Sequence, residues 1–405
     1  MIGSLQTWQW AATDDAAPLL ASLRPGASVA TLAGLRARWS PEQIAVATEI
    51  VHARSKAGIK FGARAERLIA DSDGLQMASS IRSARHKAAR FRAALGDGAT
   101  VLDACCGIGG DTMALSDAGL HVTALDLHEC RAWMAGTNAR CHWVAGDFLS
   151  HPIEVLGIHI DPARRAGDTR SRDPEAFQPP LSEIVRRLEG CRLSAVKLNP
   201  GVKPEILPSG ELEIISESGS LMQAVLWSVP AGHGSRRATL LAGDGSTHTI
   251  SADPDRPDDS TPIGDYIHTM DPALERADLV GALLRTLDAG IVFPGTGLLT
   301  ASRPIRSAWL TPFRVLDVLP WNRRSVRARL RCLRAGIVTV KTRGGLLDAD
   351  RLSRELRGDG PADLVLFVLP IDGRLRAIIT DRLTNESAPP EPTEASDGAG
   401  LGDGS

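Results

Sequence analysis

A glycine-rich loop between an apolar strand and a helix is the first part of the chain whose residue types could do chemistry. The run from Asp103 to Asp111 reads DACCGIGGD. Its glycines, among them Gly107 and Gly109, let a ligand approach the backbone without a Cβ in the way. A tight strand-to-helix turn with no ligand would have the same pattern. We interpret Cys106 and the preceding cysteine as loop packing rather than as reactive thiols.

Two further acids follow at the ends of the next apolar strands. Asp126 ends HVTALD, and Asp147 closes the following strand in AGD. Because ligands of open α/β sheets bind outside the carboxyl ends of the strands, these acids and Asp103 are expected to line one crevice. The acid at Asp111 would repel a pyrophosphate, so a cationic donor fits better than a dinucleotide. S-adenosylmethionine carries a sulfonium and an ammonium group, which predicts Asp103 near its amino acid end, Asp126 at its ribose and Asp147 at its adenine.

The stretch VLDACCGIGGDTMALSDAGLHVTALDL resembles class I S-adenosylmethionine-dependent methyltransferases and is similar to the opening of the trimethylguanosine synthase group. With DPARR, VKLNPG, RRATLL and YIHTMDPAL further along, the chain resembles bacterial methyltransferases with a THUMP-like C-terminal domain. The resemblance covers about residues 30–384. It implies an α/β fold with a Rossmann-like seven-stranded methyltransferase sheet, an α+β THUMP-like domain, S-adenosylmethionine as cofactor and RNA as substrate. With the cofactor loop, it makes Gly107, Gly109, Cys106 and the three acids the expected cofactor-binding residues.

The expected methyl acceptor site begins at Asp161 and Pro162, directly after the apolar strand VLGIHI. In the resembled amine methyltransferases, an acid or amide and a proline carbonyl accept hydrogen bonds from an exocyclic amine here, and an aromatic stacks on the base. This chain keeps only the acid and one proline of that pattern. Arg164 or its neighbour is expected to stack or to pair with a phosphate, and Phe177 or Trp143 to supply the aromatic face. The alternative for Asp161 is a structural Asp-Pro turn.

The strand LSAVKLNP adds Lys197 and Asn199 as candidate substrate contacts. Lys197 could equally be a buried, paired lysine. DPAR followed by a glycine also resembles uridine-5 RNA methyltransferases, which need a cysteine where this chain has Leu198. Leucine has no thiol to add to a pyrimidine ring, so direct in-line transfer is expected instead. The loose set of cysteines and histidines at 128–142 lacks a standard zinc spacing, so no metal is expected.

Basic residues dominate one segment near the C-terminus. Residues 323–357 hold eleven bases and three acids. Arg323, Arg327 and Arg331 fall on one side of the predicted helix RSVRARLRCLRA. We interpret this face as a surface that binds RNA phosphates, and a merely solvated arginine face is the alternative.

The surrounding elements divide the chain into predicted parts: a helical region at 1–95, a methyltransferase domain at 96–250, a linker at 251–262, a THUMP-like domain at 263–384 and a disordered acidic tail at 385–405. In the helical region, SPEQIAVATEIVHARSKAGIKF is expected to form a helix with Ser40 as its cap. The strands expected before the linker are ATVLDACC, HVTALDL, CHWVAGD, VLGIHIDP, LSAVKLNP, ELEIISES and RRATLLAG. The segment after ELEIISES is expected to be helix or loop plus helix. After the linker, MDPALERADLVGALLRTL is expected to form one helix, and DLVLFVL and LRAIIT are expected to form a closing strand pair.

Composition narrows the class of protein. The 405 residues are 43% hydrophobic and 23% charged, which excludes a mainly disordered or collagen-like chain. No apolar stretch reaches the roughly 18 residues needed to cross a bilayer, and no signal peptide is evident, so a cytoplasmic protein without a membrane partner is expected. The oligomeric state stays open.

The leading hypothesis is a methyltransferase that acts on a nucleobase in RNA. One alternative is a small-molecule methyltransferase whose second domain is a lid. The other is a noncatalytic RNA-binding protein that keeps the donor pocket, which the incomplete motif after Pro162 suggests.

Overall fold

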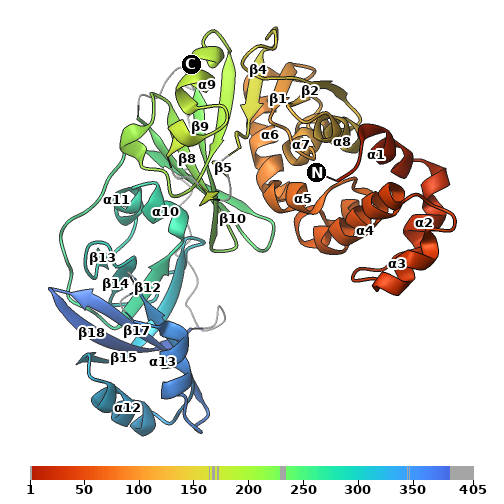
Figure 1. Cartoon of the computed structure of the whole chain (residues 1–405). Helices are drawn as coiled ribbons and strands as arrows, with labels where there is room; N and C mark the ends of the chain where they lie inside the picture. The colour runs from red at the N-terminus through yellow and green to blue at the C-terminus, as the bar shows by residue number, and fades with distance from the viewer. Residues whose placement is uncertain are drawn as a thin grey trace, which may run out of the picture. The chain divides into compact units, whose positions relative to one another are not determined.

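The computed structural model describes residues 2–163, 165–166, 169–170, 173–228, 234–343, 345 and 347–383. The predicted tail at 385–405 lies outside these residues. Figure 1 shows the path of the chain, which divides into two compact units, Met1–Thr247 and His248–Ser405. No helix in the described part is both long and apolar enough to cross a membrane.

Six helices precede the first strand: α1 (Leu5–Ala11), α2 (Ala17–Ser22), α3 (Val29–Leu35), α4 (Pro41–Phe61), α5 (Ser72–Met77) and α6 (Ile81–Leu95). The expected start of α4 is confirmed. Ser40 and Gln43 form a capping box, in which the Ser40 hydroxyl accepts from the Gln43 backbone N–H at 3.1 Å and the Gln43 side chain accepts from the Ser40 N–H at 2.9 Å. Trp8 and Ile50 of these helices pack in one core with Ile108 of the glycine-rich loop. The helical region therefore supports the loop directly.

The larger sheet has nine strands in the order β11-β10-β8-β9-β7-β4-β1-β2-β3. Its strands are β1 (Thr100–Ala104), β2 (His121–Asp126), β3 (His142–Ala145), β4 (Gly157–Ile160), β7 (Leu193–Leu198), β8 (Glu211–Glu217), β9 (Ser220–Ser228), β10 (Arg236–Leu241) and β11 (Thr247–Ala252). Helices α7 (Gly110–Asp117), α8 (Glu129–Ala139) and α9 (Leu181–Leu188) connect the parallel strands. The expected α/β fold is confirmed, whereas the count of seven strands was too low. A separate small hairpin pairs β5 (Arg165–Ala166) with β6 (Thr169–Arg170).

Strand β9 was missed, because the segment after ELEIISES was expected to be helix or loop. SLMQAVLWS is rich in residues that also favour helices, but β9 pairs antiparallel with both β7 and β8. Its central residues are buried on both faces of the sheet. Tertiary pairing therefore overrides local propensity here.

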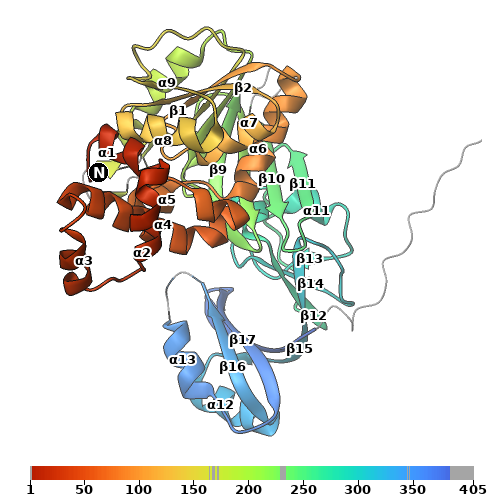
Figure 2. The same ribbon diagram turned by 90° about the vertical axis from the view of Figure 1, so that its right-hand side faces the viewer.

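Helix α6 lies beside the strands of the larger sheet (Figure 2). Its side chains contact the sheet through apolar packing and through a buried polar network. The Glu213 carboxylate of β8 lies 2.7 Å from His86 Nε2 and 2.7 Å from Arg90 Nη1. Trp227 and Thr239 also donate to it. Burial alone would raise the pKa of Glu213, but the His86 hydrogen bond and the Arg90 charge lower that pKa to about 2.

Unit 2 contains a seven-stranded sheet in the order β13-β14-β12-β15-β18-β17-β16. Its strands are β12 (Tyr266–Met270), β13 (Gly290–Ile291), β14 (Leu298–Ala301), β15 (Leu310–Pro320), β16 (Ala335–Thr342), β17 (Ala362–Ile371) and β18 (Arg374–Arg382). Helices α12 (Arg323–Cys332) and α13 (Ala349–Leu356) share one core with β16, β17 and β18. The predicted helix at RSVRARLRCLRA and the predicted closing strand pair are confirmed.

The single helix expected over MDPALERADLVGALLRTL is broken in two. Helix α10 (Pro272–Arg276) and helix α11 (Val280–Leu284) are separated by Asp278, which has a φ of 60°. At this break, Asp278 contacts a segment that precedes β12. The Asp255 N–H donates to the Asp278 carbonyl, and Arg256 Nε lies 2.5 Å from the Asp278 carboxylate. A long-range contact thus ends the helix where periodicity would continue it.

Candidate functional site

The two key glycines of the loop after β1 have different tasks. Both adopt left-handed backbone angles, with φ of 57° at Gly107 and 86° at Gly109. A Cβ on Gly109 would lie 2.7 Å from the Cα of Ala135 on α8, so this glycine is required for close packing beneath the loop. A Cβ on Gly107 would meet nothing within 4 Å, so the space above this residue is open. The open position is the one that suits a ligand.

Asp126 at the end of β2 is bound to the same loop. Its Oδ2 accepts from the Gly107 N–H at 2.9 Å, and its Oδ1 accepts from the His128 N–H at 2.9 Å. Each carboxylate oxygen has a second lone-pair site, so the carboxylate retains capacity for two hydroxyl donors. The Asp126 carboxylate therefore lies directly beside the glycine-rich loop.

Leu127, which the sequence analysis missed, follows Asp126 and exposes 72% of its surface. This exposed side chain offers an apolar surface to a flat ring. Asp147, after β3, is exposed, and its Oδ1 accepts from the Leu149 N–H at 3.0 Å. The sequence shows an apolar residue directly after the strand-end acid, but its exposure became visible only in the structure.

Asp103 does not face the crevice as expected. Its carboxylate accepts from Thr112 Oγ1 at 2.5 Å and lies 2.7 Å from His159 Nδ1, and the residue is 1% exposed. These two partners are themselves buried. Asp103 therefore joins α7 to β4 inside the core, and its assignment to the amino acid end of the donor is corrected to a structural role.

The charge of Asp111 is also neutralised, in this case by a buried lysine. Lys87 of α6, which is 1% exposed, places its Nζ 2.7 Å from Asp111 Oδ1 and 3.1 Å from His159 Nε2. Burial alone would raise the pKa of Asp111, but the charges of Lys87 and His159 hold it well below the usual value. The repulsion expected between Asp111 and a pyrophosphate is therefore offset by Lys87, and this step of the sequence argument was wrong.

Asp161 and Lys197 form an ion pair at the ends of neighbouring strands. Lys197 Nζ lies 2.6 Å from Asp161 Oδ2. The pair forms because β4 and β7 run parallel with Ile160 opposite Val196. The Asp161 N–H also donates to the Ala104 carbonyl, which places the acid beside the end of β1. Lys197 is 4% exposed, whereas the Asp161 side chain is 23% exposed.

The other residues predicted for the acceptor site are less accessible to a substrate. Phe177 is 1% exposed and lies in the core, so its ring presents no free face for stacking. Asn199 Oδ1 accepts from the Gly201 N–H at 2.7 Å and closes a turn. Pro162 is buried beside Asp161, and Trp143 packs against Gly136. Arg164 lies outside the described residues.

The two cysteines of the loop are poor nucleophiles. Desolvation raises the pKa of Cys105 and of Cys106 well above the usual thiol value, and the carboxylates of Asp103 and Asp126 raise both further. The interpretation of these residues as packing thiols is consistent with these shifts. Across the described residues, no group of three or more His, Cys, Asp or Glu side chains could hold a metal ion.

Comparison with known proteins identifies the family. A family model described as THUMP domain-like matches residues 310–382. A Mycobacterium tuberculosis (strain CDC 1551 / Oshkosh) protein named an uncharacterized S-adenosylmethionine-dependent methyltransferase is 32% identical over 316 residues, which span 74% of this chain and 84% of that protein. The equally named protein of strain H37Rv gives the same values.

The fold has a solved counterpart over nearly its whole length. The crystal structure of a Porphyromonas gingivalis W83 protein, named as a candidate methyltransferase, covers 95% of this chain and 100% of its own, with a TM-score of 0.69 and 17% identity. At 17% identity, this likeness shows the fold alone, whereas the cofactor class follows from the sequence relatives. The chain belongs to the S-adenosylmethionine-dependent methyltransferases, uses S-adenosylmethionine as its cofactor and carries a THUMP-like domain.

Proposed function

We propose that this methyltransferase transfers a methyl group directly to a nucleobase in RNA, with Asp161 aligning the acceptor. The observation that carries the proposal is the Asp161–Lys197 ion pair at the strand ends, next to the cofactor loop. The sequence analysis gave Lys197 two interpretations, a buried partner or a substrate contact. The ion pair supports the first interpretation, in which Lys197 is a buried partner that positions the Asp161 carboxylate.

The residues around the loop suit the cofactor. Open space above Gly107 leaves room for a ligand against the backbone, and Asp126 retains acceptor capacity for the ribose hydroxyls. Leu127 supplies an apolar surface for the adenine, with Asp147 beside the next strand end. When bound, S-adenosylmethionine supplies an electrophilic methyl group on a sulfonium. The protein has to orient the acceptor and exclude water.

Asp161 suits an acceptor that carries an N–H group. Paired with the Lys197 ammonium, it is a carboxylate and only accepts hydrogen bonds. It would hold an exocyclic amine so that the nitrogen lone pair is aimed at the methyl carbon. The bound cofactor would supply the methyl carbon to this nitrogen and would leave as a thioether with the electron pair of the broken sulfur–carbon bond. The excess proton on nitrogen then passes to the carboxylate or to water.

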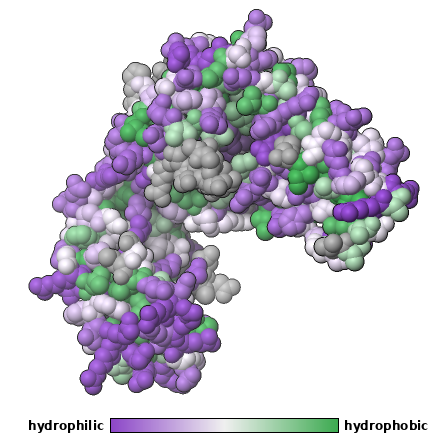
Figure 3. All heavy atoms as spheres, in the orientation of Figure 1, coloured by the Kyte–Doolittle hydropathy of each residue, from purple (hydrophilic) through white to green (hydrophobic). Residues whose placement is uncertain are grey.

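The basic face of unit 2 supports an RNA substrate. Figure 3 shows a strongly hydrophilic surface over the end of unit 2 where Figure 1 draws α12 and α13. Two of the predicted arginines are tied to α13, since Arg323 lies 3.2 Å from the Glu355 carboxylate and Arg327 donates to the Glu355 carbonyl. Arg324 and Arg331 are exposed, with no ion pair to any described residue. These two are the better candidates for phosphate contacts.

The test is methyl transfer from labelled donor to total RNA of a strain that lacks the gene, followed by identification of the labelled nucleoside. We expect label in one modified base with the parent protein and none with Asp161→Ala. Label in small molecules without RNA would support the lid alternative instead. Donor binding without any transfer would support a noncatalytic RNA-binding protein.

A further inference from the structure

We propose that a second pocket of unit 1, separate from the cofactor crevice, binds a phosphorylated nucleotide. The pocket lies between α7, α8 and the 3₁₀ helix η2 (Gly62–Arg67), and its volume is about 690 Å³. This volume is within the range of small-molecule sites. None of Gly107, Asp126 and Asp161 lines it. A ligand here would therefore be additional to the donor and the acceptor.

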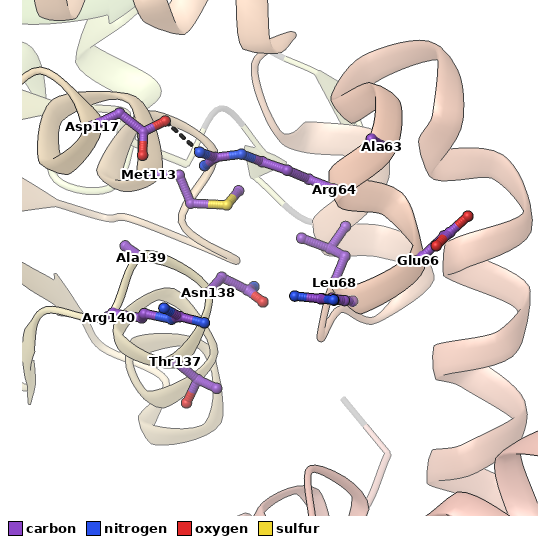
Figure 4. A pocket seen from close by; sticks show the side chains of 11 residues that line it. Ala63, Arg64, Glu66, Leu68, Met113, Asp117, Thr137, Asn138, Ala139 and Arg140 are labelled. Carbon is purple, nitrogen blue, oxygen red and sulfur yellow. Dashed lines mark hydrogen bonds and ion pairs between the residues drawn. The ribbon is translucent and has the colours of Figure 1, made fainter.

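The charges of the pocket favour an anion. Arg64 is neutralised across the pocket by Asp117 at 2.6 Å (Figure 4). Arg67 and Arg140 also line the pocket, and their guanidinium groups make no ion pair or hydrogen bond with any described residue. Figure 4 shows Arg140 pointing into the pocket and the Glu66 carboxylate pointing away from it. Two unpaired cations on one cavity repel each other unless an anion neutralises them.

The position of Arg140 adds to this argument. It follows the last turn of α8 with a φ of 54°, a left-handed conformation that glycine usually supplies at a helix end. Its backbone N–H donates to the Gly136 carbonyl, so the backbone alone completes the cap. The long cationic side chain is thus not needed for the helix end. It is free to contact a ligand.

The lining also suits an organic group and not only an inorganic anion. Ala63 and Ala139 line the pocket with exposed or partly exposed methyl groups, and the almost fully buried Leu68 and Met113 lie at its floor, which gives the cavity an apolar wall. Guanidinium groups match phosphate oxygens with paired hydrogen bonds. A flat, weakly polar ring on the apolar wall and a phosphate on the two arginines together describe a nucleotide.

The wall of the pocket is preorganised. The Asn138 carboxamide accepts from the Ile69 N–H at 3.0 Å and donates to the Ile69 carbonyl at 2.8 Å. It also donates to the carbonyl of Ile108, in the cofactor loop, at 2.9 Å. These three bonds hold the segment that follows η2 and the cofactor loop against α8 before a ligand arrives, which lowers the entropic cost of binding.

The proposal is tested by calorimetric titration of the full chain with uridine monophosphate, uridine and inorganic phosphate. Saturating S-adenosylhomocysteine is present, and a uridine nucleotide is used because adenine would also suit the cofactor crevice. We expect uridine monophosphate to bind more tightly than either uridine or phosphate. The double variant Arg67→Ala/Arg140→Ala should weaken that binding by about tenfold or more.

Two further variants keep the result interpretable. Thr137→Glu places a carboxylate on an exposed pocket residue of α8 and should also weaken the nucleotide, without removing either arginine. Arg36→Ala/Arg85→Ala removes the same charge from exposed positions outside the pocket and should bind as the parent does. Equal affinity of the parent and Arg67→Ala/Arg140→Ala would overturn the proposal. So would no binding to the parent, or uridine or phosphate binding as tightly as the nucleotide.

A short oligouridylate distinguishes the two sources of such a nucleotide. If the pocket takes a nucleotide unit of an RNA chain, Arg67→Ala/Arg140→Ala weakens the oligomer and the mononucleotide by similar factors. If it takes free nucleotides, only the mononucleotide is affected. Because neither readout involves methyl transfer, failure here leaves the proposed RNA methylation to be judged by its own test.

Discussion

Lys197 and Asp161 are 36 residues apart in the chain, and their side chains meet at 2.6 Å. The lysine is buried and the carboxylate is partly open, so in the proposed mechanism the lysine would act on the acceptor through Asp161. We expect Lys197→Met to reduce the rate of methyl transfer strongly while donor affinity stays unchanged. Lys197→Arg should restore part of the rate, because a guanidinium also holds a carboxylate.

Single-turnover transfer and calorimetric donor binding, measured on the same folded variants, check this prediction. Asp161→Ala should likewise abolish transfer and leave donor binding intact. Near-normal transfer by Asp161→Ala would show that the residue is only a turn former and that another group aligns the acceptor.

The parts that sequence predicted well are those set by local pattern. The strand ends carrying Asp126 and Asp147, the capped helix after Ser40 and the amphipathic α12 each follow from residue types a few positions apart. The parts it missed depend on partners far along the chain. Asp103 turned inward because His159 lies on the neighbouring strand, and Asp111 was neutralised by Lys87 from a helix outside the motif.

The Asp161–Lys197 ion pair could be predicted from the sequence only in part. Once β4 and β7 are taken as parallel neighbours, a register with Ile160 opposite Val196 puts both residues at one level of the sheet. The resemblance implied a seven-stranded sheet, but neither the order of its strands nor their register. Phe177 was misjudged for a related reason, because burial of an isolated aromatic residue depends on packing that no local period reveals.

Asp126 should matter for the donor more than for the fold. Asp126→Ala removes the carboxylate proposed to accept two ribose hydroxyls, and charge-assisted hydrogen bonds contribute about 1.5–3 kcal/mol each. It also leaves the N–H groups of Gly107 and His128 without their acceptor. Calorimetry should show a large loss of donor affinity in a chain that remains folded by circular dichroism. Unchanged affinity would remove Asp126 from the cofactor site.

The two loop glycines provide a matched pair. Gly109→Ala places a Cβ 2.7 Å from the Ala135 Cα, so it should lower the free energy of unfolding by a few kcal/mol. Gly107→Ala meets no atom within 4 Å and should cost only about 1 kcal/mol for its left-handed backbone, while it obstructs the donor. Urea denaturation and donor titration of both variants test this. The prediction fails if Gly107→Ala binds the donor normally.

His268 should make unit 2 sensitive to mild acid. The residue is fully buried, and its Nε2 accepts from the Ile305 N–H at 3.0 Å, so the neutral ring is favoured. Burial lowers its pKa from 6.5 to about 4. The unfolded chain therefore binds a proton more readily, and stability present above pH 6.5 is lost as the pH falls towards 4, by up to about 3 kcal/mol. His268→Gln, compared with the parent by urea denaturation between pH 7 and pH 4, should show a smaller loss; equal losses would contradict the assignment.

The exposed arginines of α12 give the sharpest test of an RNA-binding face. Arg323 and Arg327 are engaged with Glu355, so reversing them would also disturb the packing of α12 on α13. Arg324→Glu/Arg331→Glu avoids this problem, because neither side chain is paired with a described residue. We expect the variant to bind RNA more weakly and with a salt slope smaller by up to about 0.7–0.9 for each RNA phosphate that these side chains no longer neutralise. Donor affinity should not change, because these side chains belong to unit 2 and the cofactor loop to unit 1.

The matched control Arg303→Glu/Arg374→Glu makes the same change of charge at exposed positions outside α12, and should keep most of the parent's affinity for RNA. RNA affinity of the parent and both variants, measured at several salt concentrations, tests this prediction. If the α12 variant and the control lose the same affinity, RNA binding depends only on the overall charge of the protein. That result would favour the alternative of a small-molecule acceptor.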